Sequence, residues 1–131
     1  MITRVYYDDT DAGGVMYHTN YIKYCERARS EKIFSHGIIM DNEHGYFLVK
    51  SLEANYIKPV VLGDMIEIRT KLQSNKKASA ILLQEIYKDE QKVFELTVTI
   101  VYMQNSKIRA IPKEKLELIS WVINLGLKNI Q

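Results

Sequence analysis

Residues 66–73 read Ile-Glu-Ile-Arg-Thr-Lys-Leu-Gln, an alternation of side chains that is typical of a half-buried β-strand. Residues 94–102 alternate in the same way, with apolar or aromatic side chains at every even position. Residues 46–58 and 79–88 are less regular but rich in residues that favour strands. The segments are separated by turn-forming residues: Lys58-Pro59, Leu62-Gly63-Asp64, Ser74-Asn75 and Lys88-Asp89-Glu90. Because consecutive hairpin connections reverse the chain, the sequence predicts about four long antiparallel strands.

A helix is expected ahead of these strands, over roughly residues 19–34. Four residues at positions i, i+3, i+4 and i+7 share one face of it: Tyr21, Tyr24, Cys25 and Ala28. The apolar stripe weakens beyond them, where Glu31 and Lys32 follow. Thr19 or Asn20 is the expected N-cap, because both side chains can accept a hydrogen bond from the first helical amides.

Two shorter elements are expected near the ends of the chain. The alternating start predicts a strand at about residues 2–8, followed by an Asp/Gly-rich turn at residues 8–14. Pro112 suits the first turn of a closing helix, where its missing N–H would be unpaired in any case. The apolar stripe of that helix consists of Leu118, Trp121, Val122 and Leu125.

These elements together predict an α+β fold. An antiparallel sheet with one apolar face must bury that face, and the early helix is the element available to cover it. A doubly wound α/β fold is disfavoured because helices do not alternate with the later strands. The chain has no internal repeat, low-complexity tract or linker, which indicates one domain over residues 1–131.

Composition and charge narrow the class of protein. Of 131 residues, 47% are hydrophobic and 26% charged, and the net charge of +2 gives no reason to expect nucleic acid as an obligatory partner. The single cysteine, Cys25, cannot form an intramolecular disulfide, and no Cys/His cluster has metal-ligand spacing. Neither a metal nor a cofactor is expected. The N-terminus lacks an apolar signal core, and no apolar run approaches the ~20 residues that span a bilayer. We therefore expect a cytoplasmic protein without a membrane span.

Residues 7–21 are the most unusual stretch, Tyr-Asp-Asp-Thr-Asp-Ala-Gly-Gly-Val-Met-Tyr-His-Thr-Asn-Tyr. Carboxylates, adjacent glycines, a histidine and an asparagine converge where a strand is expected to pass into a helix. Glycines permit positive φ angles and close approach of a ligand to the backbone. A helix start offers unpaired N–H groups and the positive end of a dipole, both suited to an oxygen that gains negative charge.

Cleavage of a thioester requires little beyond these groups. The leaving thiol has a pKa of about 8.5, as cysteine does, so a strong general acid is unnecessary. Helix-start amides can polarise the carbonyl, as oxyanion-hole donors do. A carboxylate can then attack the carbonyl carbon directly or deprotonate water. The segment therefore favours acyl transfer to water.

A specific resemblance supports this reading. The run Asp-Thr-Asp-x-x-Gly-Val-x-Tyr-His-x-Asn-Tyr at residues 9–21, followed by Glu26-Arg-Ala-Arg29, resembles the YbgC-like branch of the 4-hydroxybenzoyl-CoA thioesterase family. Tyr56-Ile-Lys-Pro59 and Leu62-Gly63-Asp64 resemble later elements of that family. The likeness covers roughly residues 4–103. It implies a hotdog fold, a long helix wrapped by an antiparallel sheet, assembled as a dimer or dimer-based tetramer with active sites at the subunit interface.

The resemblance also implies roles for individual residues. Asp11 would be the catalytic carboxylate, as nucleophile or general base, and the backbone amide of His18 would polarise the carbonyl. The side chains of His18 and Tyr7 are expected to take part in catalysis. The expected substrate-binding residues are Gly14, Tyr17 and Asn20. Because the tyrosine-histidine pair is that of the YbgC-like branch, we expect fatty or other aliphatic acyl-CoA substrates and not a hydroxybenzoyl group.

Other activities fit the sequence less well or stay open. An aspartyl phosphotransferase would require alternating βαβ units, which the strand-rich residues 46–103 do not provide. A calcium loop from Asp9 would place Gly13 and Asn20 where oxygen-rich ligands belong. Two alternatives stay open: a hotdog-fold dehydratase acting on acyl-ACP or acyl-CoA, and a non-catalytic module that binds an acyl carrier. Acyl carrier protein also stays open as the carrier of the acyl group.

Simpler roles are expected for several other polar residues. Asp8 and Asp9 should shape or solvate the turn. Cys25 should be a buried, inert thiol. Three charged helix residues are expected to pair with neighbours on the helix or across an interface: Glu26, Arg27 and Arg29. Four basic residues are either ordinary solvated side chains or contacts for CoA phosphates: Lys58, Arg69, Lys76 and Lys77.

Overall fold

One antiparallel sheet forms most of the structure, a computed structural model that describes residues 1–120. The sheet has six strands in the order β1-β3-β4-β5-β2, and β6 pairs with β5. The strands are β1 (Ile2–Arg4), β2 (Tyr46–Tyr56), β3 (Met65–Asn75), β4 (Ser79–Lys88), β5 (Gln91–Gln104) and β6 (Lys107–Ile108). A 3₁₀ turn, η1 (Tyr7–Asp9), and the long helix α1 (His18–Phe34) lie between β1 and β2. A second helix begins at residue 113 and continues to residue 120.

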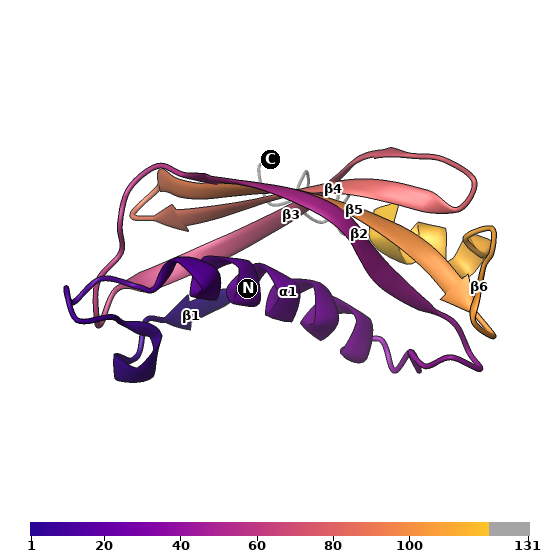
Figure 1. Cartoon of the computed structure of the whole chain (residues 1–131), viewed down its shortest axis with the longest axis horizontal. Coiled ribbons are helices and arrows are strands. Elements are labelled where there is room, and N and C mark those ends of the chain that lie inside the picture. The colour runs from indigo at the N-terminus through magenta and orange to yellow at the C-terminus, as the bar shows by residue number, and fades with distance from the viewer. Residues whose placement is uncertain (121–131) are drawn as a thin grey trace.

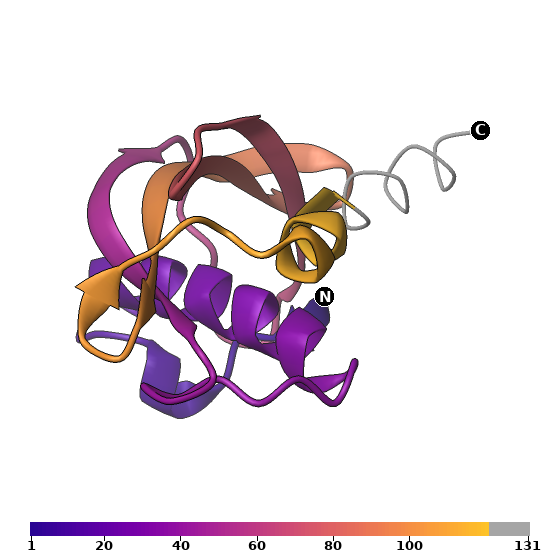
Figure 2. The ribbon, with the colours of Figure 1, turned by 90° about the vertical axis from the view of Figure 1, so that its right-hand side faces the viewer.

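The sheet curls around α1. Figure 1 shows α1 running beneath the long strands, and Figure 2 shows the strands curving around it when the molecule is viewed from the end. Long strands coil in this way because of their right-handed twist, and the coiled sheet has a concave face that one helix can fill. The predicted α+β architecture, a helix wrapped by an antiparallel sheet, is confirmed.

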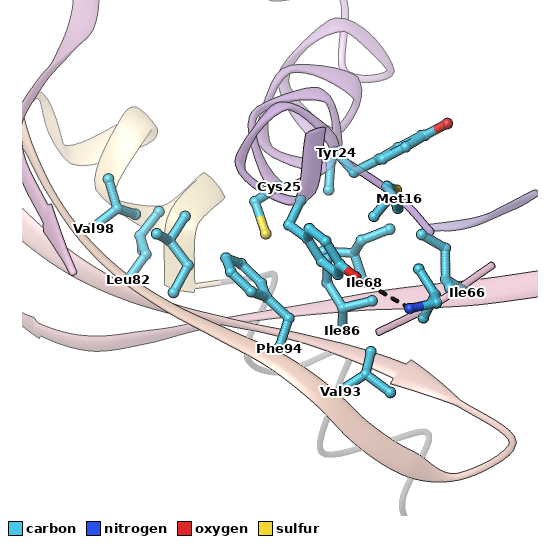
Figure 3. Close-up of a cluster of buried hydrophobic side chains, with 14 of the residues drawn as sticks. Met16, Tyr24, Cys25, Ile66, Ile68, Leu82, Ile86, Val93, Phe94 and Val98 are labelled. Atoms are coloured by element: carbon cyan, nitrogen blue, oxygen red, sulfur yellow. Dashed lines mark hydrogen bonds between the residues drawn. The ribbon is translucent and has the colours of Figure 1, made fainter. Parts of the chain in front are cut away.

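The core lies between α1 and the concave face of the sheet. The buried residues of α1 are the four predicted from its spacing: Tyr21, Tyr24, Cys25 and Ala28. Figure 3 shows Cys25 opposite Phe94, in a cluster that includes Ile68 and Ile86. The predicted alternation in β5 is confirmed by its buried residues, which include Phe94, Leu96, Val98, Ile100 and Tyr102. Burying each large apolar side chain contributes about 1.5–3 kcal/mol, so this face provides much of the stability.

Two expectations about chain path are wrong. The predicted strand at residues 2–8 ends at Arg4, because the chain then turns into η1. The connection from β2 to β3 is a crossover and not a hairpin, since β2 pairs with β5 while β3 pairs with β1 and β4. Within that connection, the Val60 carbonyl accepts a hydrogen bond from the Met16 amide at 2.8 Å. Val61 forms a bridge with Val15, so this link pairs with the turn before α1.

The helix boundaries also refine the predictions. The N-cap of α1 is Tyr17, which makes no side-chain capping hydrogen bond, so the expected cap at Thr19 or Asn20 is wrong. The closing helix starts immediately after Pro112, as predicted, and its buried described residues include Lys115 and Ile119. The predicted stripe residues Trp121, Val122 and Leu125 lie outside the described part of the chain.

Gln84 is the polar anchor between α1 and the sheet. This β4 side chain is fully buried. Its Nε2 donates to the Cys25 carbonyl at 2.8 Å and to Thr70 Oγ1 at 3.1 Å, and its Oε1 accepts from Arg29 Nη1 at 2.6 Å. One side chain therefore joins the middle of α1 to two neighbouring strands and fixes the helix over the sheet.

We expect Gln84→Leu to lower the free energy of unfolding by about 2–4 kcal/mol, because buried partners in α1 lose their hydrogen bonds. Urea unfolding followed by circular dichroism measures this loss. Gln73→Leu, at an exposed position of β3, is the control and should change stability by less than about 0.5 kcal/mol. Equal losses in the two variants would contradict the anchoring role.

Candidate active site

A buried carboxylate holds the segment between β1 and α1. Asp9 exposes 2% of its surface. Its Oδ2 accepts from the Tyr6 amide at 3.0 Å and from the Tyr24 hydroxyl at 2.5 Å. Its backbone carbonyl accepts from the Tyr17 amide at 2.8 Å and from Asn20 Nδ2 at 3.0 Å. The turn is thereby tied to the first two turns of α1, which confirms that Asp9 shapes it.

Asp11 lies at the tip of the turn that Asp9 supports. Its amide donates to the Val15 carbonyl at 2.9 Å, and its own carbonyl accepts from the Gly14 amide at 3.0 Å. Its Oδ1 accepts from the Gly13 amide at 2.8 Å. Gly14 has a φ of +79°, which favours glycine, and a Cβ at Gly13 would lie 3.3 Å from Asp11 Oδ1. The paired glycines therefore let the backbone fold closely around this carboxylate, which is exposed in the single chain.

The start of α1 presents hydrogen-bond donors to solvent. The Asn20 amide donates to the Tyr17 carbonyl at 2.9 Å. The amides of His18 and Thr19, by contrast, have no hydrogen-bond acceptor within residues 1–120. The positive end of the helix dipole lies at these two amides and favours an anionic or polarised oxygen there. The absence of a side-chain cap thus leaves both amides without an acceptor in the described part of the chain.

A cavity of about 220 Å³ adjoins this helix start. Its lining residues are Met16, His18, Tyr21, Tyr56, Ile57, Lys58 and Pro59. The Tyr56 hydroxyl donates to the His18 carbonyl at 2.6 Å, and the Tyr21 hydroxyl accepts from the Val60 amide at 3.1 Å. The Tyr21 and Tyr56 rings meet edge to face, with centroids 5.3 Å apart. Two aromatic side chains therefore form a fixed wall opposite His18.

The negative charge of Asp11 affects the pKa of Tyr21, one of the two aromatic residues in that wall. Burial raises the pKa of Tyr21, the amide of Val60 opposes the rise, and the negative charges of Asp11 and Asp64 add to it. Asp64 is itself engaged, because its Oδ2 accepts from the Val61 amide at 2.8 Å and pairs with Lys88 at 3.0 Å. Asp11 is therefore the nearby carboxylate that is exposed and has no cationic partner within the described residues.

The other predicted site residues differ in their position relative to the cavity. Tyr17 lies beside the cavity, with its ring centroid 4.4 Å from that of His18. The side chain of Asn20 points back to the Asp9 carbonyl, as a structural hydrogen bond. Tyr7 exposes 82% of its surface and does not line the cavity. The structure therefore brings His18 to the cavity wall, packs Tyr17 against His18 and leaves Tyr7 at the surface.

Sequence reasoning missed the wall formed by residues 56–59. The sequence identifies this segment as a family motif and Lys58 as a possible contact for a CoA phosphate, but it does not predict that the segment forms a cavity wall. Its position follows from the crossover after β2, where the amides of Ile57 and Lys58 both donate to the Val93 carbonyl, at 2.9 and 3.1 Å. Pro59 in a turn after an aromatic-rich strand was the available signal, but a strand pattern does not reveal which distant turn a segment will contact.

The four basic residues predicted as possible contacts for CoA phosphates differ in their positions and in their partners within the chain. Lys58 lines the cavity. Arg69 is engaged within the chain by hydrogen bonds to Glu67 and Glu90, and its guanidinium lies 3.9 Å from the centroid of the Tyr87 ring. Lys76 and Lys77 lie in the turn between β3 and β4. Lys58 is therefore the basic residue best placed beside the helix start.

The charged residues of α1 pair within the chain, as predicted. The Glu26 carboxylate accepts from Ser30 Oγ at 2.7 Å, one turn along the helix. The Arg27 guanidinium lies 5.4 Å from the centroid of the Tyr24 ring. Arg29 reaches Gln84 on β4. None of these residues lines the cavity at the helix start.

Within residues 1–120, no three His, Cys, Asp or Glu side chains form a group that could hold a metal ion. Neither helix in the described part of the chain is long and apolar enough to cross a bilayer.

Comparisons with known proteins agree with the fold. Residues 5–121 match the thioesterase-like superfamily. The chain is 41% identical to the acyl-CoA thioesterase YbgC of Helicobacter pylori, over 93% of this chain and 100% of that protein. It is 39% identical to the acyl-CoA thioester hydrolase YbgC of Escherichia coli, over 84% and 87% of the two chains. A hypothetical protein from Aquifex aeolicus superposes with a TM-score of 0.85 at 28% identity, covering 92% of this chain and 98% of that one.

The architecture is that of the hotdog fold, as expected. The chain belongs to the thioesterase-like superfamily. The predicted enzyme class, a thioester hydrolase, is confirmed by this membership and by relatives at 32–49% identity.

Cys25, unlike the exposed Asp11, is buried. Its side chain is fully buried in the core, opposite Phe94 (Figure 3). Burial raises the pKa of the Cys25 thiol to about 12, so the thiolate is scarce at neutral pH. The prediction of a buried thiol is confirmed.

We expect Cys25 in the native protein to react at least ~10³-fold more slowly than free cysteine with a disulfide reagent at pH 8, because both access and thiolate are lacking. Release of the coloured thiol from Ellman's reagent measures the rate. Addition of guanidinium chloride should expose one full equivalent of reactive thiol. Native reactivity within a few fold of free cysteine would show that the thiol is accessible and would contradict this burial.

Proposed function

We propose that this thioesterase hydrolyses fatty or other aliphatic acyl-CoA thioesters to the free acid and CoA. The observation that carries the proposal is the exposed Asp11 carboxylate, held on a turn that is tied to the start of α1, where two amides are uncovered. The relatives that are named acyl-CoA thioesterases support CoA as the carrier. The apolar and aromatic lining, including Met16 and Ile57, favours an aliphatic acyl group over a polar one.

The reaction follows from the placement of these groups. The carbonyl oxygen accepts hydrogen bonds from the amides of His18 and Thr19, which stabilise the charge that develops in the transition state. Asp11 then attacks the carbonyl carbon to give a mixed anhydride that water hydrolyses, or it removes a proton from the water that attacks. In both routes the CoA sulfur leaves with the electron pair of the broken C–S bond, and its low basicity removes the need for a strong acid.

The remaining site residues act around that centre. The His18 side chain and the ring of Tyr17 position the thioester at the cavity mouth. Tyr7 and Gly14 are exposed, and we propose that they face the substrate from the solvent side, whereas Asn20 acts by holding the Asp9 carbonyl. Lys58 is placed to meet a phosphate of CoA. Acyl carrier protein is the competing carrier, since the same thioester could be presented on either.

We further propose that the active protein is a homodimer, or a tetramer built from such dimers. β2 ends the sheet and presents unpaired backbone groups along its outer edge. Leu48, Val49 and Leu52 on this strand expose between 41% and 50% of their surfaces. Two copies joined through β2 would continue the sheet, bury these side chains and cover Tyr56, which lines the cavity. One domain spanning residues 1–131 in the cytoplasm, with the thiol of Cys25 reduced, completes the proposal.

Asp11→Asn should lower turnover of an aliphatic acyl-CoA by at least ~10²-fold, because the amide can neither attack nor take up a proton. Folding and acyl-CoA binding should survive, since Asp11 is exposed. Release of CoA thiol measures turnover. Asp8→Asn, an exposed carboxylate of the same segment, is the matched control and should retain activity within a few fold.

Undiminished hydrolysis by the Asp11→Asn variant would remove this carboxylate from the mechanism. The same assay separates the rival functions. A dehydratase would change the absorbance of an enoyl or hydroxyacyl chain without releasing thiol, and a binding module would do neither.

Leu52→Lys should weaken dimer formation at least ~10-fold, because a charge would be buried where the two β2 edges meet. Sedimentation velocity at several protein concentrations measures the dissociation constant. Ile108→Lys, at a side chain of β6 that is 64% exposed, should leave assembly unchanged. A Leu52→Lys protein that remains dimeric at the wild-type dissociation constant would place the interface elsewhere.

A further inference from the structure

A second cavity, of about 230 Å³, lies at the opposite end of α1 from His18. It is bordered by the last turns of α1, by strands of the sheet and by the helix that begins at residue 113. Its walls are largely apolar and include Ile33, Met40, Phe47, Leu82, Ile100 and Ile119. No residue lines both this cavity and the one beside His18. At a rise of about 1.5 Å per residue, Ile33 and His18 are roughly 22 Å apart along the helix axis.

One charged group in the wall of this cavity, Arg29, has a neutral hydrogen-bond partner. Arg29 is half-buried, and burial lowers the pKa of its guanidinium. Its Nη1 donates to the neutral Gln84 Oε1 at 2.6 Å. The charge of Glu26 opposes the lowering of the Arg29 pKa, but among residues 1–120 no carboxylate lies within ion-pair distance of Arg29. A guanidinium stays charged even in an apolar wall. The N–H groups that do not bind Gln84 match the geometry of a carboxylate.

A second positively charged side chain borders the cavity. Lys32 lines it together with Arg29. Glu26 is the acidic lining residue, and its carboxylate is exposed and already accepts a hydrogen bond from Ser30. Two cationic side chains and one solvated carboxylate therefore border an apolar chamber. This combination fits a molecule with an aliphatic chain and a single anionic head.

We infer that this cavity binds an aliphatic monocarboxylate, with its chain among the apolar side chains and its carboxylate on Arg29. An engineered apolar cavity of roughly 150 Å³ in another protein admits benzene, so the volume here suffices for a medium-length chain. The inference does not depend on the proposed hydrolysis. If that activity holds, the ligand belongs to the same chemical class as the acid released, and α1 joins the two sites.

The methionine methyl groups distinguish the two cavities. Met40 lines the cavity near Arg29 and Met16 lines the cavity near His18. We expect titration of the full chain with decanoate to shift the Met40 methyl resonance in a ¹H–¹³C spectrum, and to shift it again in Asp11→Asn. A shift confined to Met16, or no shift at Met40 at millimolar decanoate, would overturn the inference.

Charge recognition is tested with decanol, which has the same chain without the carboxylate. Wild-type protein should bind decanoate at the Met40 site at least ~10-fold more tightly than decanol, as expected for a charge-assisted hydrogen bond. Arg29→Gln should abolish that preference, whereas Arg29→Lys should retain part of it. Arg27→Gln, on the same helix but outside the cavity lining, should leave it unchanged. Equal preferences in all four proteins would refute the role of Arg29.

These readouts are independent of the hydrolytic reaction. Loss of thiol release from every acyl-CoA would sink the proposed function and leave the Met40 shift intact. A normal turnover rate with no shift at Met40 would refute the second binding site and leave the proposed function intact.

Discussion

The whole site depends on the burial of the Asp9 carboxylate. Burying an ionised group is unfavourable unless donors surround it, and here the Tyr6 amide, the Tyr24 hydroxyl and the Lys23 ammonium, 3.7 Å away, do so. Tyr24 belongs to the buried face of α1. The carboxylate therefore links the chain before the turn to the core of the helix, and the Asp11 turn follows as a consequence of that link.

A second constraint is the single long helix that the sheet encloses. Because Gln84 fixes the middle of α1 over β3 and β4, both ends of the helix have defined positions relative to the strands. The first turn carries two amides that have no acceptor among residues 1–120, and it lies beside Tyr56. The last turns border a separate apolar chamber that contains Arg29. The geometry of one helix thus determines where both cavities occur.

Periodicity was sufficient to predict the layers of this fold. Alternation in residues 94–102 and the stripe that contains Cys25 identified the two faces that meet in the core, since burial acts directly on such patterns. The β2–β3 crossover was not predictable, because a short Pro/Gly-containing link has the same local sequence whether it closes a hairpin or crosses the sheet. For the same reason the wall at residues 56–59 was missed. The motif did identify the turn and the helix start, and the roles of its side chains stay predictions.

The central claim is that the thioester carbonyl rests on the amides at the start of α1 and faces Asp11. The most direct test is a crystal structure with a non-hydrolysable acyl-CoA analogue that has a ketone in place of the thioester. The account predicts the ketone oxygen about 3 Å from the amide of His18 or Thr19, with the Asp11 carboxylate, or one water bound to it, next to the carbonyl carbon. A ketone bound elsewhere, with Asp11 facing bulk solvent, would contradict it.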